Sequence, residues 1–376
     1  MQYDLIVVGG GPAGMAAARA ARDQGERVLL LDDNPGLGGQ IWRGREDLRL
    51  EGVELGLGHT LTEWRGEAKR LILACGAREL LLPFPGWTMP HVVGAGGLQA
   101  LVKQGLAIQG KRVVVCGSGP LLLAVAANLR KAGAEVPRVA EQAPWEKLLT
   151  FGLGLWRWPS KIFEAVGYAT SGYRAGLWPV EAWEGGVTLS DGSKINCDYV
   201  ACGFGLVANG ELARLLGCRM NGGLVAVDDW QRTSVEGVYA VGEMTGIGGV
   251  EKAEAEGRAA GARQRVTGNW GAFASALAKA FALREELRAL ATAETIVCRC
   301  EDVRWGRIAT MGGKRQARLE ARCGMGACQA RICGPALEWM CGWGPENVRP
   351  PLFPLSVREF LRDRDEAGHP PTGHSL

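Results

Sequence analysis

The feature that most constrains the fold is a glycine-rich turn between two apolar runs near the start of the sequence. Leu5–Val8 leads into Gly9-Gly-Gly-Pro-Ala-Gly14, an alanine-rich run follows, and a second apolar run ends at Asp32. In such a GxGxxG turn the glycines allow a tight bend, the approach of a pyrophosphate and close packing of the helix on the strand. Asp32 lies near the position, about 20 residues beyond the turn, where an acid binds a ribose hydroxyl. The pattern predicts a dinucleotide-binding βαβ unit.

A second copy of this pattern begins where Val113–Val115 leads into another glycine turn. It is altered, because Leu122 takes the place of the third glycine and Pro137, which cannot donate a ladder hydrogen bond, falls inside the expected second strand. Ala140 stands where the first copy has its acid. We expect a second domain that binds an adenine nucleotide such as NAD(P) or ATP, and a copy kept only for its structure is the alternative. The candidate contacts are Gly117, Gly119 and Glu141.

Composition excludes several function classes. The net charge of +3 gives no electrostatic reason to expect nucleic acid, and four histidines make a histidine-based triad or a multi-histidine metal site improbable. The first strand begins too close to the initiator Met for a signal peptide, and the apolar runs are too short for a membrane span. We therefore expect a cytoplasmic protein whose cysteines are reduced or metal-bound.

The cysteines are unevenly distributed, since six of the eleven lie between positions 298 and 341. Cys298 and Cys300 form a CxC pair, and Cys328 and Cys333 form a CxxxxC pair. Four soft thiolates of this kind suit either a [2Fe-2S] cluster or zinc. Cys323 makes the assignment ambiguous, because Cys323 and Cys328 have the same spacing as Cys328 and Cys333.

A third signal is the segment Gly237–Glu243, GVYAVGE, followed by a helical run. With the two glycine turns, it resembles the two-dinucleotide-binding-domain flavoproteins, which include thioredoxin reductase and glutathione reductase. In that family the matching acid binds the ribityl chain of FAD. Leu73–Arg78 and Tyr199–Gly203 resemble the family's crossover strands. The FAD contacts implied by the turn and by this resemblance are Gly9, Gly11, Pro12, Ala13, Gly14, Asp32, Asp33, Gly39, Gln40, Ala74, Gly76, Gly242 and Glu243.

The resemblance implies an α/β fold with a discontinuous FAD domain and a small C-terminal helical domain. Between them, Phe273, Leu277 and Phe281 recur every four residues, which predicts an amphipathic linker helix that packs on the flavin domain or, alternatively, contacts a partner. The implied divisions are an FAD-binding domain at 1–105 and 222–268, a nucleotide-type domain at 106–221, a linker helix at 269–294, a [2Fe-2S] domain at 295–350 and a tail at 351–376.

Disulfide reductases of this superfamily carry a redox-active cysteine pair beside the flavin, whereas the matching stretch Gly36–Ile41 has no cysteine. The flavin therefore needs another electron acceptor. The C-terminal cysteine segments, including Gly324-Met-Gly-Ala-Cys328-Gln, resemble the bacterioferritin-associated-ferredoxin-like domain. That resemblance implies that Cys298, Cys300, Cys328 and Cys333 hold a [2Fe-2S] cluster, with Cys323 as a spare thiol.

Longer strings, such as GGQIW at Gly38–Trp42 and GSGPLLLAVAA at Gly117–Ala127, extend the resemblance over nearly the whole chain. They are similar to the flavoprotein α subunits of opine oxidase, D-hydroxyproline dehydrogenase and hydrogen cyanide synthase. The resemblance implies an oxidoreductase subunit that takes electrons from a catalytic flavoprotein β subunit, and a small third subunit is a further implied partner. FAD and [2Fe-2S] would pass the electrons to a respiratory acceptor, which would bring the complex to the inner membrane.

No residue of this chain is expected to act as a general base, because no histidine, tyrosine or lysine constellation accompanies the flavin motifs. Arg78 is expected either to face the flavin ring or to close a helix. Two other functions remain open: a self-contained NAD(P)H-dependent reductase of a ferredoxin-type acceptor, and a non-enzymatic scaffold stabilised by zinc.

Overall fold

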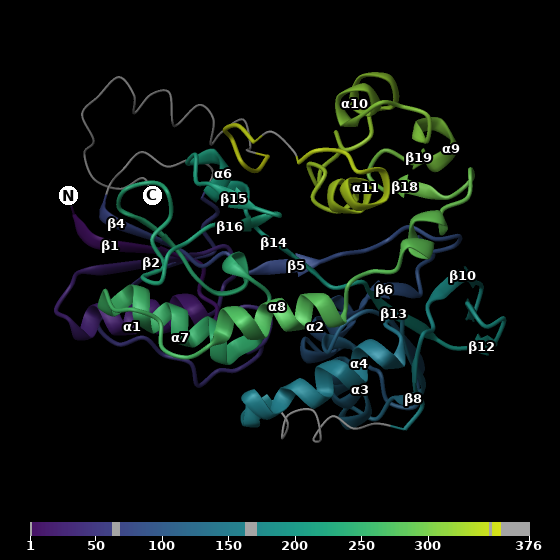
Figure 1. Ribbon diagram of the computed structural model, residues 1–376, viewed down its shortest axis with the longest axis horizontal. Helices are drawn as coiled ribbons and strands as arrows, with labels where there is room; N and C mark the ends of the chain where they lie inside the picture. The colour runs from purple at the N-terminus through teal and green to yellow at the C-terminus, as the bar shows by residue number, and fades with distance from the viewer. Residues whose placement is uncertain (1, 62–67, 162–170, 346–347, 355–376) are drawn as a thin grey trace.

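The computed structural model describes residues 2–61, 68–161, 171–345 and 348–354, and within them the chain forms two five-stranded parallel sheets (Figure 1). The first sheet lies beside the N-terminus, and the second lies at the opposite lower side of the view. A smaller C-terminal unit sits above the second sheet. Most of the predicted tail, residues 355–376, falls outside the described residues.

The first sheet contains the predicted βαβ unit at its centre. Its order is β17-β4-β1-β2-β3, and its central strands are almost wholly apolar and buried, as parallel strands covered on both faces require. The third strand signal of the sequence, near residue 238, completes this sheet at one edge. Its strands are β1 (Tyr3–Val8), β2 (Val28–Asp32), β3 (Glu54–Leu57), β4 (Ala68–Leu73) and β17 (Val238–Ala240).

Two helices, α1 (Pro12–Asp23) and α7 (Gly249–Ala262), cross at backbone distance over this sheet. A Cβ atom on Gly257 would lie 2.1 Å from the carbonyl oxygen of Ala13, and one on Gly261 would lie 2.2 Å from that of Ala17. Small residues on both helices therefore allow α7, from the second FAD-type segment of the sequence, to pack directly on α1, from the first.

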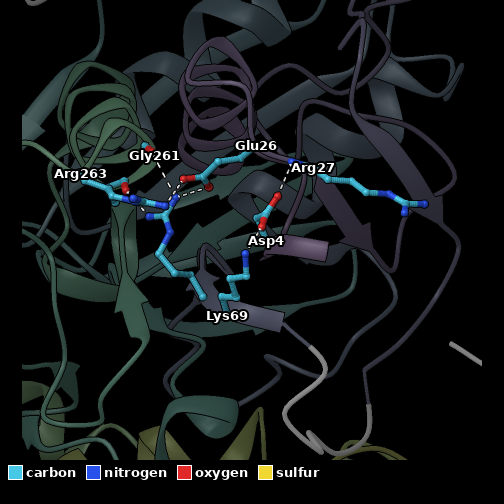
Figure 2. A network of polar contacts seen from close by, with 8 residues as sticks. Asp4, Glu26, Arg27, Lys69, Gly261 and Arg263 are labelled. Carbon is cyan, nitrogen blue, oxygen red and sulfur yellow. Dashed lines mark hydrogen bonds and ion pairs between the residues drawn. The ribbon is translucent and has the colours of Figure 1, made fainter. Parts of the chain in front are cut away.

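A polar network closes the end of the sheet opposite the glycine turn (Figure 2). Glu26 accepts from both Arg70 and Arg263, and Asp4 accepts from Lys69 at 2.7 Å and from the backbone N–H of Arg27 at 3.0 Å. Arg70 also donates to the carbonyl oxygens of Ala260 and Gly261 at 3.0 and 3.3 Å. A cation at the C-terminal carbonyls of α7 stabilises the helix dipole, so this network fixes the far end of α7.

The second sheet repeats the parallel βαβ plan in the order β6-β13-β7-β8-β9. A three-stranded antiparallel sheet packs beside it and shares its core. The parallel strands are β6 (Val92–Gly94), β7 (Arg112–Gly117), β8 (Glu135–Glu141), β9 (Tyr173–Ala175) and β13 (Tyr199–Gly203), the antiparallel strands are β10 (Pro179–Trp183), β11 (Gly186–Leu189) and β12 (Lys194–Asn196), and the helices are α2 (Ala95–Lys103), α3 (Leu121–Lys131), α4 (Trp145–Gly154) and the 3-10 turn η1 (Leu155–Arg157).

Pro137 lies inside β8, as expected from the sequence, and the strand accommodates it by an irregularity. The register of β7 and β8 shifts between Arg112 and Val114, and β9 pairs with β8 only from Val139 onward. Because the ladder is interrupted on one side and has not begun on the other, the missing N–H of Pro137 leaves no ladder bond unmade.

Short elements connect the two sheets and cover the first one. Of the two crossover segments predicted from the sequence, Leu73–Arg78 runs from the end of β4 into β5 (Ala77–Glu79), whereas Tyr199–Gly203 is β13 of the second sheet. β5 pairs antiparallel with β14 (Leu206–Ala208), which follows β13. The remaining elements of this region are α6 (Glu211–Leu215), β15 (Met220–Asn221), β16 (Leu224–Val225) and η2 (Gly242–Thr245).

The predicted linker helix is divided in the structure. Helix α8 (Trp270–Ala280) ends before Phe281, and the next turn is η3 (Glu285–Ala289). Phe273 is buried against Phe151 and Trp158, with ring centroids 6.3 and 5.3 Å apart, so α8 packs mainly on the second domain and not on the flavin domain as expected. The division follows from tertiary contacts, because Ser118 donates to the carbonyl oxygen of Phe281 at 3.1 Å.

The C-terminal unit combines a small hairpin with three helices around its own core. Its elements are β18 (Ile296–Cys298), β19 (Val303–Arg304), α9 (Trp305–Ile308), α10 (Lys314–Ala321) and α11 (Cys333–Cys341). After it, Leu352 is buried in the core of the first domain, and Val348 and Phe353 pack against the same core. Among the described residues there is no helix with the length and hydropathy needed to cross a membrane.

Candidate functional site

The first glycine turn contains two glycines that the fold itself requires. A Cβ atom on Gly9 would lie 2.2 Å from the carbonyl oxygen of Ala74, and one on Gly14 would lie 1.8 Å from that of Gly9. Gly9 also has a φ of +111°, which side chains other than glycine rarely adopt. These contacts bring the predicted turn against Ala74 and fix its geometry.

Gly11 is different, because no atom of the described residues lies closer than 4.0 Å to a Cβ added there. Its φ is −74°, and the nearest atom to an added Cβ is the Cα of Gly39, 4.0 Å away. A Cβ would instead occupy the open space in front of the N-terminus of α1, where Pro12 and Ala13 begin the helix. That position is where a pyrophosphate meets unpaired backbone N–H groups, so the turn fits the FAD that the sequence implies.

The other predicted FAD contacts lie around the same turn, with different degrees of access. Gly39 faces Gly11, and Gly242 packs on Ala13, whose Cβ would be 2.9 Å from a Cβ at position 242. Gly76 follows Ala74 with a φ of +66°, while the side chains of Asp33 and Gln40 are exposed. The structure therefore gathers residues from four distant segments of the sequence at one helix end.

Asp32, the predicted ribose acid, is buried at the end of β2 and accepts hydrogen bonds from the chain itself. One carboxylate oxygen accepts from the backbone N–H of Gly10, and the other accepts from the backbone N–H of Asn34 at 2.7 Å. These bonds hold the acid against the glycine turn.

Glu243 lies in η2 (Gly242–Thr245), which precedes α7. Its carboxylate accepts from the backbone N–H groups of Gly248 and Gly249 at 3.2 and 3.0 Å, which satisfies donors at the helix start. Burial raises the pKa of this carboxyl above its ordinary value. The structure thus gives Glu243 a capping role at the start of α7 that the sequence did not reveal.

A buried ion pair lies beside Gly242, and no motif of the sequence predicts it. Lys252, only 2% exposed, donates from Nζ to the carbonyl oxygen of Gly242 and to Oγ1 of Thr245, each at 2.8 Å, and forms an ion pair with Glu256 at 2.8 Å. Glu256 in turn accepts from the backbone N–H of Gly242 at 2.8 Å. Both backbone polar groups of Gly242 are thus fixed by a charged pair on α7.

In the second glycine turn, the predicted acid binds the turn itself. Glu141 accepts from the backbone N–H groups of Gly119 and Ala143 at 2.7 and 2.8 Å. Burial raises the pKa of this carboxyl to about 7. Gly117, which would place a Cβ 1.9 Å from the carbonyl oxygen of Gly203, is required by the packing of the turn on β13. A carboxylate of the protein therefore accepts from Gly119, the counterpart of Gly11, whereas in the first turn Asp32 accepts from Gly10.

The C-terminal cysteines form two groups. The sulfur atoms of Cys298, Cys323 and Cys333 all lie within 4.8 Å of one another, and all three residues are buried. Cys300 is exposed and makes hydrogen-bonding contacts with the backbone and thiol of Cys328, which is half-buried. The structure thus includes Cys323, which the sequence predicts only as a spare thiol, in the inner group.

Local backbone features hold these two groups in place. Gly324 donates its N–H to the sulfur of Cys298 at 3.4 Å, and a Cβ at Gly326 would lie 2.2 Å from the Cβ of Cys300. Hydrogen bonds from the thiols of Cys323 and Cys333 hold the pKa of Cys298 down at about 2. Three sulfur atoms within 4.8 Å of one another are a donor set suited to soft metals, so the residues fit either iron–sulfur or zinc.

Arg78 links the flavin segment to the cysteine segment, a role that the sequence did not predict. Its guanidinium donates from Nε to the carbonyl oxygen of Arg331 at 2.9 Å and from Nη1 to Oδ1 of Asn209 at 2.7 Å, and it pairs with Glu211 at 2.8 Å. Asn209 donates to the carbonyl oxygen of Cys75 at 2.8 Å. A short polar chain therefore runs from the loop after β4 to the loop between Cys328 and Cys333.

Comparison with known proteins agrees with this arrangement. Residues 40–257 match the family described as pyridine nucleotide-disulphide oxidoreductase, and residues 4–45 match FAD dependent oxidoreductase. These matches support FAD as the cofactor of an oxidoreductase.

Full-length relatives are subunits of larger enzymes. The chain is 29% identical to a subunit of opine oxidase from Rhizobium meliloti (strain 1021), over 95% of this chain and 98% of that protein. It is also 29% identical to hydrogen cyanide synthase subunit HcnB of Pseudomonas protegens, over 89% of this chain and 90% of that protein.

Solved structures show the same fold. L-proline dehydrogenase from P. horikoshii aligns with a TM-score of 0.69 at 18% identity, covering 95% of this chain and 78% of that one. T. acidophilum thioredoxin reductase aligns with a TM-score of 0.52 at 20% identity, covering 69% of this chain and 97% of that one. The chain therefore belongs to the pyridine nucleotide-disulphide oxidoreductase family, and over nearly its whole length it is similar to opine oxidase subunits.

Proposed function

We propose that this chain is the FAD and [2Fe-2S] electron-transfer subunit of a heteromeric dehydrogenase that oxidises the C–N bond of an amino acid, imino acid or opine. A partner flavoprotein β subunit would oxidise the substrate, and a small third subunit would complete the complex. This chain would pass the electrons to a respiratory acceptor. FAD suits the junction because it accepts electrons in pairs and releases them singly.

The single observation that carries the proposal is the polar chain between the two candidate cofactor sites. Cys75 follows Ala74 at the FAD turn, and Arg331 lies between the predicted ligands Cys328 and Cys333. Arg78 and Asn209 connect the backbones of these two loops through three hydrogen bonds. A fixed relation between the two loops is what electron transfer between their cofactors needs. The similarity to HcnB and to the opine oxidase subunit supports the substrate class.

Within the proposed FAD site, this chain's residues bind and orient. The N-terminus of α1 and Gly11 would hold the pyrophosphate, Asp32 or the exposed Asp33 the ribose, and Gly242 with Glu243 the ribityl chain. In the C-terminal unit, Cys298 and Cys333 would bind one iron, and Cys300 and Cys328 the other. Each iron in a [2Fe-2S] cluster takes two protein sulfurs, and the two observed groups supply at least that number.

A second candidate, an NAD(P)H-dependent reductase, is favoured by the second nucleotide-type domain, which keeps the parallel βαβ plan despite its altered glycine turn. Against it stands Glu141, whose carboxylate already binds the N–H of Gly119, where the phosphates of a nicotinamide dinucleotide would be held. A zinc-stabilised scaffold is the third candidate, since three thiols at one point also suit zinc.

The experiment that separates these functions is purification of the tagged chain from its own cells, followed by identification of bound proteins, flavins and metals. The proposal expects a second flavoprotein chain in fixed ratio, with FAD and iron on this chain. A protein that purifies alone and whose flavin is bleached by NADPH supports the reductase. Zinc without iron supports the scaffold.

A further inference from the structure

The two cysteine groups contain five thiols, whereas a [2Fe-2S] cluster needs four. The outer pair, Cys300 and Cys328, supplies two thiols, and the described residues contain no group of three thiols at that position. The inner group supplies three: Cys298, Cys323 and Cys333. The fifth thiol therefore lies in the inner group, at the position of the inner iron.

Geometry gives all three inner thiols access to that position. Two thiolates on one tetrahedral metal lie about 3.8 Å apart when each metal–sulfur bond is about 2.3 Å. The three sulfurs lie within 4.8 Å of one another, so a small rotation of the Cys323 or the Cys333 side chain brings either sulfur to that separation from the sulfur of Cys298. The residues are 1%, 4% and 3% exposed in sequence order, so solvent access does not favour Cys333 over Cys323.

Cys298 differs from the other two thiols in its backbone contacts. Cys298 ends β18 and accepts the N–H of Gly324, a bond that fixes its sulfur next to Cys323. Cys323 follows the end of α10, and Cys333 is the first residue of α11. The two exchangeable thiols thus come from different segments, the loop after α10 and the start of α11, which share one core with Cys298.

We infer that Cys323 is an exchangeable ligand of the inner iron: it can replace Cys333, with the displaced thiolate taking up the proton that Cys323 releases. The inference rests on the proposed [2Fe-2S] cluster. It assigns to Cys323 a role beyond that of a spare thiol, and it makes Cys298, Cys300 and Cys328 the ligands that have no substitute.

The test compares serine variants of the full chain, purified without oxygen, by iron content and by the electron paramagnetic resonance (EPR) spectrum after dithionite reduction. Cys323→Ser should keep two irons and the native spectrum. Cys333→Ser should also keep two irons, with a shifted spectrum because a different sulfur binds the inner iron. The double variant should lose at least nine-tenths of its iron, as should Cys298→Ser.

Cys341→Ser is the matched control, because this half-buried thiol lies in α11 outside both groups. Flavin absorbance reports in every variant whether the rest of the chain has folded. Loss of iron from Cys333→Ser with a native spectrum in Cys323→Ser would make Cys323 a bystander and overturn the inference. Loss of iron from both single variants would overturn exchange as well. Iron-free wild-type protein is the separate result that contradicts the proposed function.

Discussion

Arg78 donates a hydrogen bond from Nε to the carbonyl oxygen of Arg331, 2.9 Å away, although the two residues are 253 positions apart in the sequence. The same guanidinium pairs with Glu211, whose side chain is 18% exposed. One planar group thus holds three partners, a geometry that lysine cannot reproduce.

Arg78→Ala should lower the free energy of unfolding by about 2–3 kcal/mol, because it leaves a largely buried carboxylate and a carbonyl without their charged donor. It should also slow electron transfer from flavin to cluster, measured by rapid mixing. Arg78→Lys should restore the charge and little of the rate. The control is Arg258→Ala. This exposed arginine forms a long ion pair of 3.8 Å with Glu254, which should contribute less than about 1 kcal/mol to the free energy of unfolding. Equal rates in Arg78→Ala and wild type would leave the polar chain without a role in transfer.

Gly11→Ala should fold normally and lose FAD. Its backbone tolerates alanine, while the new methyl group would occupy the space in front of α1. We expect an increase in the FAD dissociation constant of at least tenfold, measured by fluorescence titration of apoprotein, with unfolding unchanged. Gly36→Ala is the control, because a Cβ there contacts nothing within 4 Å. Gly14→Ala should instead fail to fold stably. Unaltered FAD binding in Gly11→Ala would show that the cofactor does not approach this turn.

Lys252→Met should destabilise the protein by about 3–5 kcal/mol, because Glu256 would remain buried without its cation. Chemical denaturation followed by flavin fluorescence measures the effect. Replacing both residues, Lys252→Met with Glu256→Leu, should recover part of the loss. Only part is expected, since Glu256 also accepts from the N–H of Gly242. The exposed Lys279→Met is the control. A single variant as stable as the control would mean that the pair is hydrated and not buried.

Stability should fall as pH rises from about 5 to 7, with Glu141 as one cause. Burial raises the pKa of this carboxyl from 4.5 to about 7, so in this window the folded protein holds a proton that the unfolded chain has released. The contribution is fully present below the unfolded pKa and is lost once the pH exceeds the folded one. At about 1.4 kcal/mol per pKa unit, the loss is on the order of 3 kcal/mol.

Glu141→Gln should remove this part of the pH dependence, because an amide does not titrate in the window. Urea unfolding at a series of pH values makes the comparison, with the exposed Glu135→Gln on the same strand as control. Identical pH profiles for Glu141→Gln and wild type would exclude the carboxyl as the source.

Local signals predicted the α/β architecture well because the glycine turns and apolar strands are set by short-range chemistry. The strands that lead into both turns fall where the pattern indicated. The prediction of a single linker helix was wrong. The apolar periodicity of the sequence continues past Phe281, but Ser118 and Gln142 donate hydrogen bonds to the carbonyl oxygen of Phe281, where the helix ends. Contacts of this kind are tertiary and leave no periodic trace.

In the candidate site, too, local motifs were predictable from the sequence and tertiary contacts were not. Gly9, Ala74 and Gly242 could be brought together from motifs alone, but the burial of Lys252 and Glu256 could not. A lysine and a glutamate four residues apart on a helix usually face solvent, and only the close packing of α7 on α1 encloses this pair. Cys323 had the right spacing for a ligand, yet spacing fitted two pairs equally well. Its place beside Cys298 depends on how α10 meets α11.

The most direct test of the electron-transfer function is an anaerobic titration of the native complex with amino acids, imino acids and opines, followed by absorbance and EPR spectroscopy. We predict that one such substrate bleaches the flavin of this chain and produces the signal of one reduced [2Fe-2S] cluster, whereas NADH and NADPH produce neither. Bleaching of the isolated chain by NADPH, or full flavin reduction in the complex without any iron–sulfur signal, would contradict this function.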